Sequence, residues 1–268
     1  MAFANPLLER WAAGGVTLGG WMTTADPQVA EFLASCGFDE VCVDQQHGLA
    51  DARSIAGAFR SIELHGAVPT TRVPANEPAL IGISLDLGAL GVVIPMVESA
   101  EEAARAVAAC RYAPHGHRSA GPLRGGIVRG EGGRDDHERV AVVAMVETAS
   151  GLRNVDGIAG TPGVDAVYIG PADLALSLGL SWDPADWSPS ETNVHRAAIE
   201  AIRVACARHD VTAGIHCANG AAARSYIEQG FRMLTVTSDL GLLKAGGLAE
   251  LQAARGATDQ AQSTEVAV

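Results

Sequence analysis

The sequence predicts a closed (β/α)8 barrel, and three observations support this fold class. The chain has 268 residues, close to the roughly 250 residues that are typical of such a barrel. Eight short, nearly continuous apolar runs recur along it, each followed by an Ala- and Leu-rich amphipathic stretch. Strands buried on both faces of a parallel sheet have this composition. An open doubly wound sheet is the competing fold, but no G-x-G-x-x-G motif follows the first strand.

Local signals place strands and helices in alternation. The expected strands are, in chain order, Val16–Met22, Glu40–Asp44, Val68–Val73, Gly91–Met96, Val140–Glu147, Ala166–Gly170, Thr212–His216 and Met233–Thr237. Asp26 before Pro27 predicts an N-cap followed by a first helical position, and Ser99 with Glu102 predicts a capping box. Helix ends are marked by glycines that follow apolar helical stretches, namely Gly37, Gly66, Gly88 and Gly230.

Composition and charge exclude several classes of protein. Acidic residues outnumber basic ones 31 to 19, for a net charge of −12, which argues against a nucleic-acid partner. The sequence has no run of about 18 apolar residues, so it predicts no membrane span. The five cysteines are odd in number, widely spaced and without a C-x-x-C motif, as expected of reduced thiols in a cytoplasmic protein. We expect one barrel domain over residues 1–255 and a frayed polar tail over 256–268.

Two carboxylates follow successive strands of the predicted barrel. Glu147 ends the fifth strand, and Asp173 follows the sixth in the sequence Gly-Pro-Ala-Asp. The carboxyl ends of barrel strands meet at one mouth, where the chemistry of this fold takes place. Two carboxylates there repel each other unless a cation lies between them, and oxygen ligands suit Mg²⁺ or Mn²⁺. The alternative hypothesis is that each carboxylate caps the helix that follows it.

Three more polar residues are expected at the same mouth. His47 follows Asp44 by three residues, so a hydrogen bond that the imidazole donates to the carboxylate would suit a general base. A loop histidine on a satisfied turn is the alternative. Arg72 ends an apolar strand, where its guanidinium could hold a carboxylate or an enolate oxygen. For Arg72 the alternative is a structural salt bridge across the mouth.

These strand-end residues belong to a series of motifs. They are Ala34–Asp39, Val43–Gly48, Arg72-Val-Pro, Leu85–Ala89, Val93–Val97, Arg111–Arg118, Met145–Thr148 and Tyr168–Leu174. In this order they resemble the class II, metal-dependent pyruvate aldolases, of the 4-hydroxy-2-oxoheptanedioate and 2-dehydro-3-deoxyglucarate aldolase type. The resemblance covers about residues 18–253.

The resemblance implies a fold, an assembly and a set of roles. It implies a (β/α)8 barrel that assembles as a homo-hexamer, with the last helix exchanged between neighbouring subunits. It implies Glu147 and Asp173 as ligands of Mg²⁺ or Mn²⁺, with Co²⁺ a further option. His47 would be the acid/base, Asp44 its partner, and Arg72 would lie beside the keto oxygen.

Substrate contacts are expected around the same mouth. The residues expected to bind substrate are Arg72, Gln46, Thr148, Gly170, Pro171 and Ala172. Gln46 departs from the family, which often has Glu at this position, and the change bears on rate and substrate choice. Backbone N–H groups at the helix starts after Glu147 and Gly170 would receive the substrate carboxylate. The surface that selects the aldehyde is expected to include the Arg111–Glu138 loop and a neighbouring subunit.

The expected reaction is the reversible cleavage of 4-hydroxy-2-oxo acids to pyruvate or hydroxypyruvate and an aldehyde, through a metal-stabilised enolate. Aldolases stabilise the carbanion with a lysine Schiff base or with a divalent cation. Lys244 is the one lysine of the chain and falls in the final helix, which argues against a Schiff base on a barrel strand. The alternatives are a 2-oxo-acid decarboxylase or acyl-thioester lyase on the same scaffold, or a barrel that only binds a metabolite.

Overall fold

Eight parallel strands close into a barrel in the computed structural model, which describes residues 4–122, 124, 127, 139–181 and 193–255. Each strand pairs with its neighbours in sequence, and β1 pairs with β8 to close the ring. The strands are β1 (Thr17–Met22), β2 (Glu40–Asp44), β3 (Val68–Arg72), β4 (Gly91–Ile94), β5 (Ala141–Val146), β6 (Ala166–Ile169), β7 (Thr212–His216) and β8 (Met233–Ser238). The predicted fold class is therefore confirmed.

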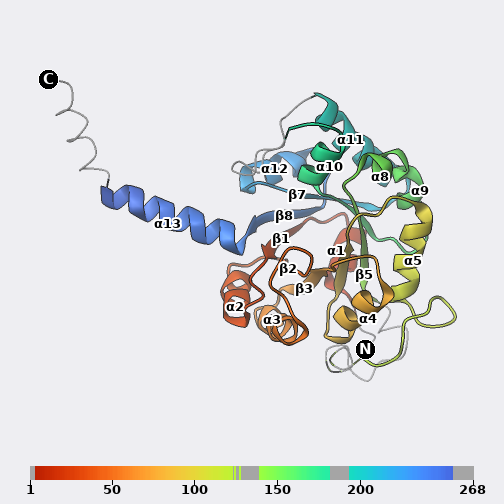
Figure 1. The fold of residues 1–268 in the computed structure, drawn as a ribbon, viewed down its shortest axis with the longest axis horizontal. Coiled ribbons are helices and arrows are strands. Elements are labelled where there is room, and N and C mark those ends of the chain that lie inside the picture. Colours follow the sequence, from red (N-terminus) through yellow and green to blue (C-terminus); the bar gives the residue numbers. More distant parts are fainter. Residues whose placement is uncertain (1–3, 123, 125–126, 128–138, 182–192, 256–268) are drawn as a thin grey trace.

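Helices cover the outside of the barrel, apart from one at each end of the chain (Figure 1). They are α1 (Pro6–Ala12), α2 (Pro27–Ser35), α3 (Ala52–Leu64), α4 (Pro78–Asp86), α5 (Ala100–Cys110), α8 (Ala149–Arg153), α9 (Val155–Ala159), α10 (Pro171–Ser177), α11 (Asn193–Arg208), α12 (Gly220–Glu228) and α13 (Asp239–Arg255). Asp26 and Ser99 cap α2 and α5, as the sequence predicts. The expected tail over 256–268 lies outside the described residues. No helix of the described ranges is long and apolar enough to span a membrane.

The predicted strands agree with the observed ones to within two residues at either end. The fourth strand is shorter than expected, because Pro95 follows Ile94 and Met96 then has a φ of 56°. That left-handed conformation is uncommon for a residue with a side chain and does not continue a strand. The chain therefore leaves the barrel sharply after β4.

The barrel interior and the helix layer form two separate apolar cores. Alternation along each strand sends Val41 and Val43 of β2 to the helices, whereas Cys42 lies among the interior residues. Helix α1 places Leu7 and Trp11 in the interior core. The side-chain amide of Asn5 donates to the carbonyls that precede β4 and β5. Helix α1 thus covers the amino-terminal end of the barrel, and substrates have the opposite mouth open to them.

The described part of the Arg111–Glu138 loop does not lie where we expected it. The loop joins the end of α5 to the start of β5, so it begins at the covered end of the barrel. Arg118 donates to Asp86 at the end of α4, and Arg124 pairs with Glu63 near the end of α3. Within one chain, this described part therefore lies toward the covered end of the barrel.

Glu40 is a buried carboxyl group at the covered end of the barrel. It is the first residue of β2 and only 2% exposed. Burial raises its pKa to about 7, a rise that the nearby hydroxyl of Thr70 limits and the charge of Asp39 reinforces. Gly19 of β1 provides the space, because a Cβ there would lie 3.0 Å from Glu40 Cγ. At neutral pH the ionised form of this side chain therefore works against folding.

We predict that Glu40→Gln stabilises the protein at alkaline pH and not at acid pH. The unfolded chain loses the Glu40 proton near pH 4.5, whereas the folded chain keeps it until about pH 7. The wild type should therefore lose about 3 kcal/mol relative to the variant between pH 5 and pH 8. Denaturant unfolding at both pH values measures the difference, with Glu9→Gln as the exposed control. Equal pH dependence of wild type and Glu40→Gln would contradict the assignment.

Candidate functional site

A buried ion pair lies at the open mouth, where β2 and β3 end. Asp44 and Arg72 are the last residues of these strands and are direct partners in the strand pairing. Arg72 Nε donates to Asp44 Oδ1 at 2.9 Å, and Nη2 donates to Oδ2 at 2.6 Å. The side chain of Arg72 is 8% exposed and that of Asp44 is 1% exposed. This two-pronged geometry fixes the plane of the guanidinium group.

Asp44 and Arg72 each stabilise the ionised form of the other inside the barrel. Burial would raise the pKa of Asp44, but the hydrogen bonds and charge of Arg72 outweigh it, and the pKa falls below its usual value. Burial likewise opposes the charged form of Arg72, yet its pKa is raised by Asp44. Both groups are thus ionised near neutral pH. Removing one partner of such a buried pair leaves the other uncompensated, at a cost of about 3–5 kcal/mol.

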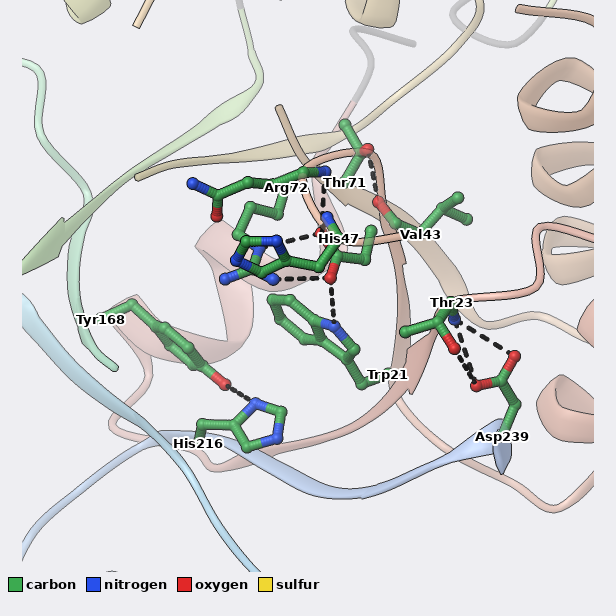
Figure 2. Close-up of polar contacts among 11 residues, drawn as sticks. Trp21, Thr23, Val43, His47, Thr71, Arg72, Tyr168, His216 and Asp239 are labelled. Atoms are coloured by element: carbon green, nitrogen blue, oxygen red, sulfur yellow. Dashed lines mark hydrogen bonds and ion pairs between the residues drawn. The ribbon is translucent and has the colours of Figure 1, made fainter. Parts of the chain in front are cut away.

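Aromatic side chains lie on one side of the pair, and Trp21 and Tyr168 are not among the predicted site residues (Figure 2). The indole of Trp21, near the end of β1, donates from Nε1 to Asp44 Oδ2 at 3.2 Å. The Arg72 guanidinium carbon lies 5.0 Å from the centre of the same indole. Tyr168 stacks near Trp21, and His216 meets it edge-on. Inward alternation along β1 and β6 was the signal that could have found Trp21 and Tyr168.

His216 closes one side of this aromatic group. Its Nδ1 lies 3.3 Å from Tyr168 Oη, which donates to Thr235 Oγ1 at 2.6 Å. Burial lowers the pKa of His216 to about 4, and the charge of Arg72 lowers it further. The imidazole is therefore neutral at physiological pH, which makes it a polar wall of the mouth.

The predicted hydrogen bond between Asp44 and the His47 imidazole is absent. Both oxygens of Asp44 bind Arg72 instead, and Oδ1 also accepts the backbone N–H groups of Gln46 at 3.0 Å and His47 at 3.4 Å. His47 is exposed, and in the described ranges its ring makes no side-chain hydrogen bond. Asp44 thus shapes the turn that carries His47 through the backbone. The reason is the strand register, which places Arg72 opposite Asp44.

Glu147 is a buried carboxylate with one unused oxygen. It follows β5 directly and is 2% exposed. Its Oε1 accepts the backbone N–H of Met96 at 2.9 Å, and Oε2 has no partner among the described residues. Burial raises the pKa of Glu147 to about 7, and the negative charge of Asp173 adds to the rise. A cation beside these carboxylates would favour their ionised forms and so oppose the rise in the Glu147 pKa.

Gly170 leaves space next to that free oxygen. A Cβ at Gly170 would lie 2.5 Å from Glu147 Oε2, closer than a real side chain is found. Asp173 is exposed in the first turn of α10, two residues after its first helical position at Pro171. The donor set of two carboxylates and the space that Gly170 leaves fit a hard divalent cation, completed by water and substrate oxygens. Within the described residues, no cluster of three or more His, Cys, Asp and Glu side chains offers a closed metal cage.

The remaining predicted site residues border this part of the mouth. Thr148 is the N-cap of α8, and its hydroxyl accepts the N–H of Gly151 at 2.9 Å. The cap that we considered for Glu147 is thus supplied by Thr148. Pro171 and Ala172 form the start of α10, where His195 holds the Pro171 carbonyl at 3.0 Å through Nε2. The first turn of α10 is therefore fixed from α11.

Known proteins resemble this chain over most of its length. A relative from Rhizorhabdus wittichii named hydroxypyruvate/pyruvate aldolase is 36% identical over 242 residues, covering 90% of this chain and 95% of the relative. A relative from Salmonella arizonae named 5-keto-4-deoxy-D-glucarate aldolase is 33% identical over 247 residues, covering 91% and 94%. The likeness thus runs through the whole barrel.

Solved structures of similar fold also match most of this chain. A HpcH/HpaI aldolase/citrate lyase family protein from Burkholderia cenocepacia has a TM-score of 0.86 and 33% identity, covering 94% of this chain and all of the other. Macrophomate synthase has a TM-score of 0.80 at 25% identity, covering 93% and 90%. The sequence pattern of the HpcH/HpaI aldolase/citrate lyase family matches residues 17–245. The chain therefore belongs to the HpcH/HpaI aldolase/citrate lyase family.

Proposed function

We propose that this protein is a carbon–carbon lyase, a class II aldolase that reversibly cleaves 4-hydroxy-2-oxo acids to an aldehyde and pyruvate or hydroxypyruvate. Family membership and the names of its relatives support the aldolase reaction and small-molecule substrates. The observation that carries the metal-dependent form is the buried Glu147 carboxylate, whose Oε2 has no partner in the described structure. That oxygen lies in the same mouth as the Arg72–Asp44 pair.

Glu147 and Asp173 would hold the divalent metal ion, for which Mg²⁺ and Mn²⁺ are the first candidates and Co²⁺ a third. When bound there, the ion supplies Lewis-acid polarisation of the substrate carbonyl and keeps the two carboxylates ionised. Gly170 keeps the space beside Glu147 clear. Backbone N–H groups in the turn that contains Pro171 and Ala172 would receive the substrate carboxylate, with Thr148 and Gln46 at the border of the site.

Arg72 would stabilise the negative charge that develops on the keto oxygen as the C3–C4 bond breaks. Asp44 occupies its Nε and Nη2, so Nη1 stays outside the ion pair. His47 would take the proton of the 4-hydroxyl group, since its exposed imidazole stands on the turn after β2. Asp44 contributes by fixing both the guanidinium and the turn of His47. Its role therefore differs from the partner role that the sequence predicts.

The one lysine of the chain is not placed for a Schiff base on a barrel strand. Lys244 lies on α13, where it is exposed, and Figure 1 shows this helix extending away from the barrel. A Schiff base needs a lysine amine that is desolvated next to the substrate carbonyl.

The free cysteines are consistent with a cytoplasmic protein, where thiols stay reduced.

We also propose that α13 packs against another subunit in a homo-oligomer, with the hexamer as the expected form. Asp239 fixes the start of α13 by accepting the backbone N–H groups of Thr23 and Thr24. Every later residue of the helix is exposed, including Leu243 at 73%. Most of the stability of a helix in a protein comes from tertiary packing of its apolar face, so a packing partner for the apolar side of α13 is expected.

The metal site is tested by Gly170→Ala. The added methyl group would meet Glu147 Oε2, so we expect metal affinity to fall at least about tenfold, with folding retained. Calorimetric titration of the chelator-treated protein with Mn²⁺ measures the affinity. Asp173→Ala should abolish binding, whereas Gly82→Ala has open space around its Cβ and serves as the control. Unchanged affinity in both site variants would refute this metal site.

The enolate-stabilising role of Arg72 is tested by substitution. We expect Arg72→Ala to lower kcat for cleavage of a 4-hydroxy-2-oxo acid by about a hundredfold, the scale for loss of an oxyanion donor. Pyruvate release, followed with lactate dehydrogenase, measures the rate. Arg72→Lys keeps a positive charge beside Asp44 but loses the two-pronged geometry, so it separates catalysis from lost stability. A near-normal kcat for a folded Arg72→Ala protein would rule out the role.

The assembly is tested on α13. At 100° per residue, Leu240, Leu243, Leu248 and Leu251 share one side of the helix, and Leu242 lies opposite. We expect Leu243→Glu to shift the protein from its oligomer to a smaller species in light scattering. Leu242→Glu should leave the mass unchanged. A monomeric wild type, or equal masses for all three proteins, would contradict this role of α13.

A further inference from the structure

Trp21 lies at the centre of the polar and aromatic groups at the mouth (Figure 2). It is 5% exposed, so its contacts are made in a water-poor environment. Nε1 donates to Asp44 Oδ2 at 3.2 Å, on the oxygen that also accepts Arg72 Nη2. The hydrogen bond helps to lower the pKa of Asp44. Trp21 thus restrains the carboxylate at the oxygen that Arg72 Nη2 also contacts.

The indole also contacts the other member of the ion pair. The Arg72 guanidinium carbon lies 5.0 Å from the centre of the indole, within the range of a cation–π interaction. One aromatic side chain from β1 therefore touches both an acid from β2 and a base from β3. A shift of this indole would change the position of the carboxylate and of the guanidinium together.

The indole is itself held in place by neighbours from β6 and β7. The Tyr168 ring is nearly parallel to it, at 12° and 6.1 Å between centres, and the His216 ring stands at 81° and 5.1 Å. Tyr168 is fully buried and anchored by its hydrogen bond to Thr235. Because both neighbours are fixed by the barrel, the indole has a defined position at the mouth.

We propose that Trp21 is a positioning residue, which holds Asp44 and Arg72 in the geometry that the aldolase reaction uses. For its effect on rate, this inference rests on the proposed function. Trp21 acts through the ion pair, by one hydrogen bond and one ring face. The acceptor of this hydrogen bond is a charged carboxylate. Losing a hydrogen bond to a charged group costs more free energy than losing one between neutral groups.

Trp21→Phe tests the proposal, because it keeps an aromatic ring and removes the N–H group. We expect kcat for cleavage of the 4-hydroxy-2-oxo acid to fall roughly tenfold, the scale for one hydrogen bond to a charged group. KM should stay within about twofold, because Arg72 acts on charge that develops in the transition state. Trp11→Phe is the matched control, since its indole also loses one hydrogen bond, to Thr17, but at the covered end of the barrel.

A double-mutant cycle separates positioning from general loss of stability. If Trp21 acts through the ion pair, then Trp21→Phe should cost less than about twofold once Asp44→Ala is present. Trp11→Phe should have the same small effect in both backgrounds. A tenfold loss that persists in the Asp44→Ala background, or an equal loss in Trp11→Phe, would overturn the proposal.

A spectroscopic measurement tests the contact without relying on activity. The four tryptophans can be replaced by 5-fluorotryptophan. Each ¹⁹F signal is then assigned from its loss in the matching Trp→Phe variant. If Trp21→Phe does not fold, the Trp21 signal is the one left after the other three are assigned. We expect Asp44→Ala to move the Trp21 signal more than the other three. An unmoved Trp21 signal would refute the contact with Asp44. A wild type without metal-dependent cleavage would refute the proposed function instead, and the ¹⁹F result would still decide whether Trp21 holds the pair.

Discussion

A buried ion pair between Arg72 and Asp44 organises the open mouth of this barrel. Neither charge would be stable alone at that depth, since removing one partner of a buried pair is costly. The paired register of β2 and β3 brings the two side chains together. Once paired, Asp44 also accepts the backbone N–H groups of Gln46 and His47. One carboxylate therefore determines the direction of the guanidinium and the shape of the turn that carries the imidazole.

The other side of the mouth has an opposite electrostatic character. Glu147 is buried without a cationic partner, and its pKa rises to about 7 for that reason. Its Oε1 is fixed by Met96, a residue held at a φ of 56°. Backbone strain of this kind costs on the order of 1–3 kcal/mol and is common at functional sites. The mouth thus combines a charge-balanced half at β2 and β3 with a half at β5 and β6 that has excess negative charge, which supports the proposed metal site.

Much of the fold was predictable because its signals are local. Continuous apolar runs and caps such as Asp26 and Ser99 depend on neighbouring residues, so the strands and several helix starts agree with the structure. For the site, the sequence predicts which residues end the strands and so lie at the mouth, but not which of them contact each other. That Asp44 binds Arg72 rather than the His47 ring depends on the register between two strands, which no single segment encodes. Trp21 was missed because its contacts come from strands distant in sequence. The described part of the Arg111–Glu138 loop lies toward the covered end of the barrel, which the length of the loop does not reveal.

We propose that this mouth forms a pyruvate enolate with the help of a divalent cation. The most direct test is the exchange of the pyruvate methyl protons in D₂O, followed by proton NMR with Mg²⁺ or Mn²⁺ and with a chelator control. The test needs no knowledge of the aldehyde. We expect a loss of the methyl signal that requires both the protein and the metal. Exchange no faster than in protein-free solution with either metal, for pyruvate and for the C3 protons of hydroxypyruvate, would contradict it.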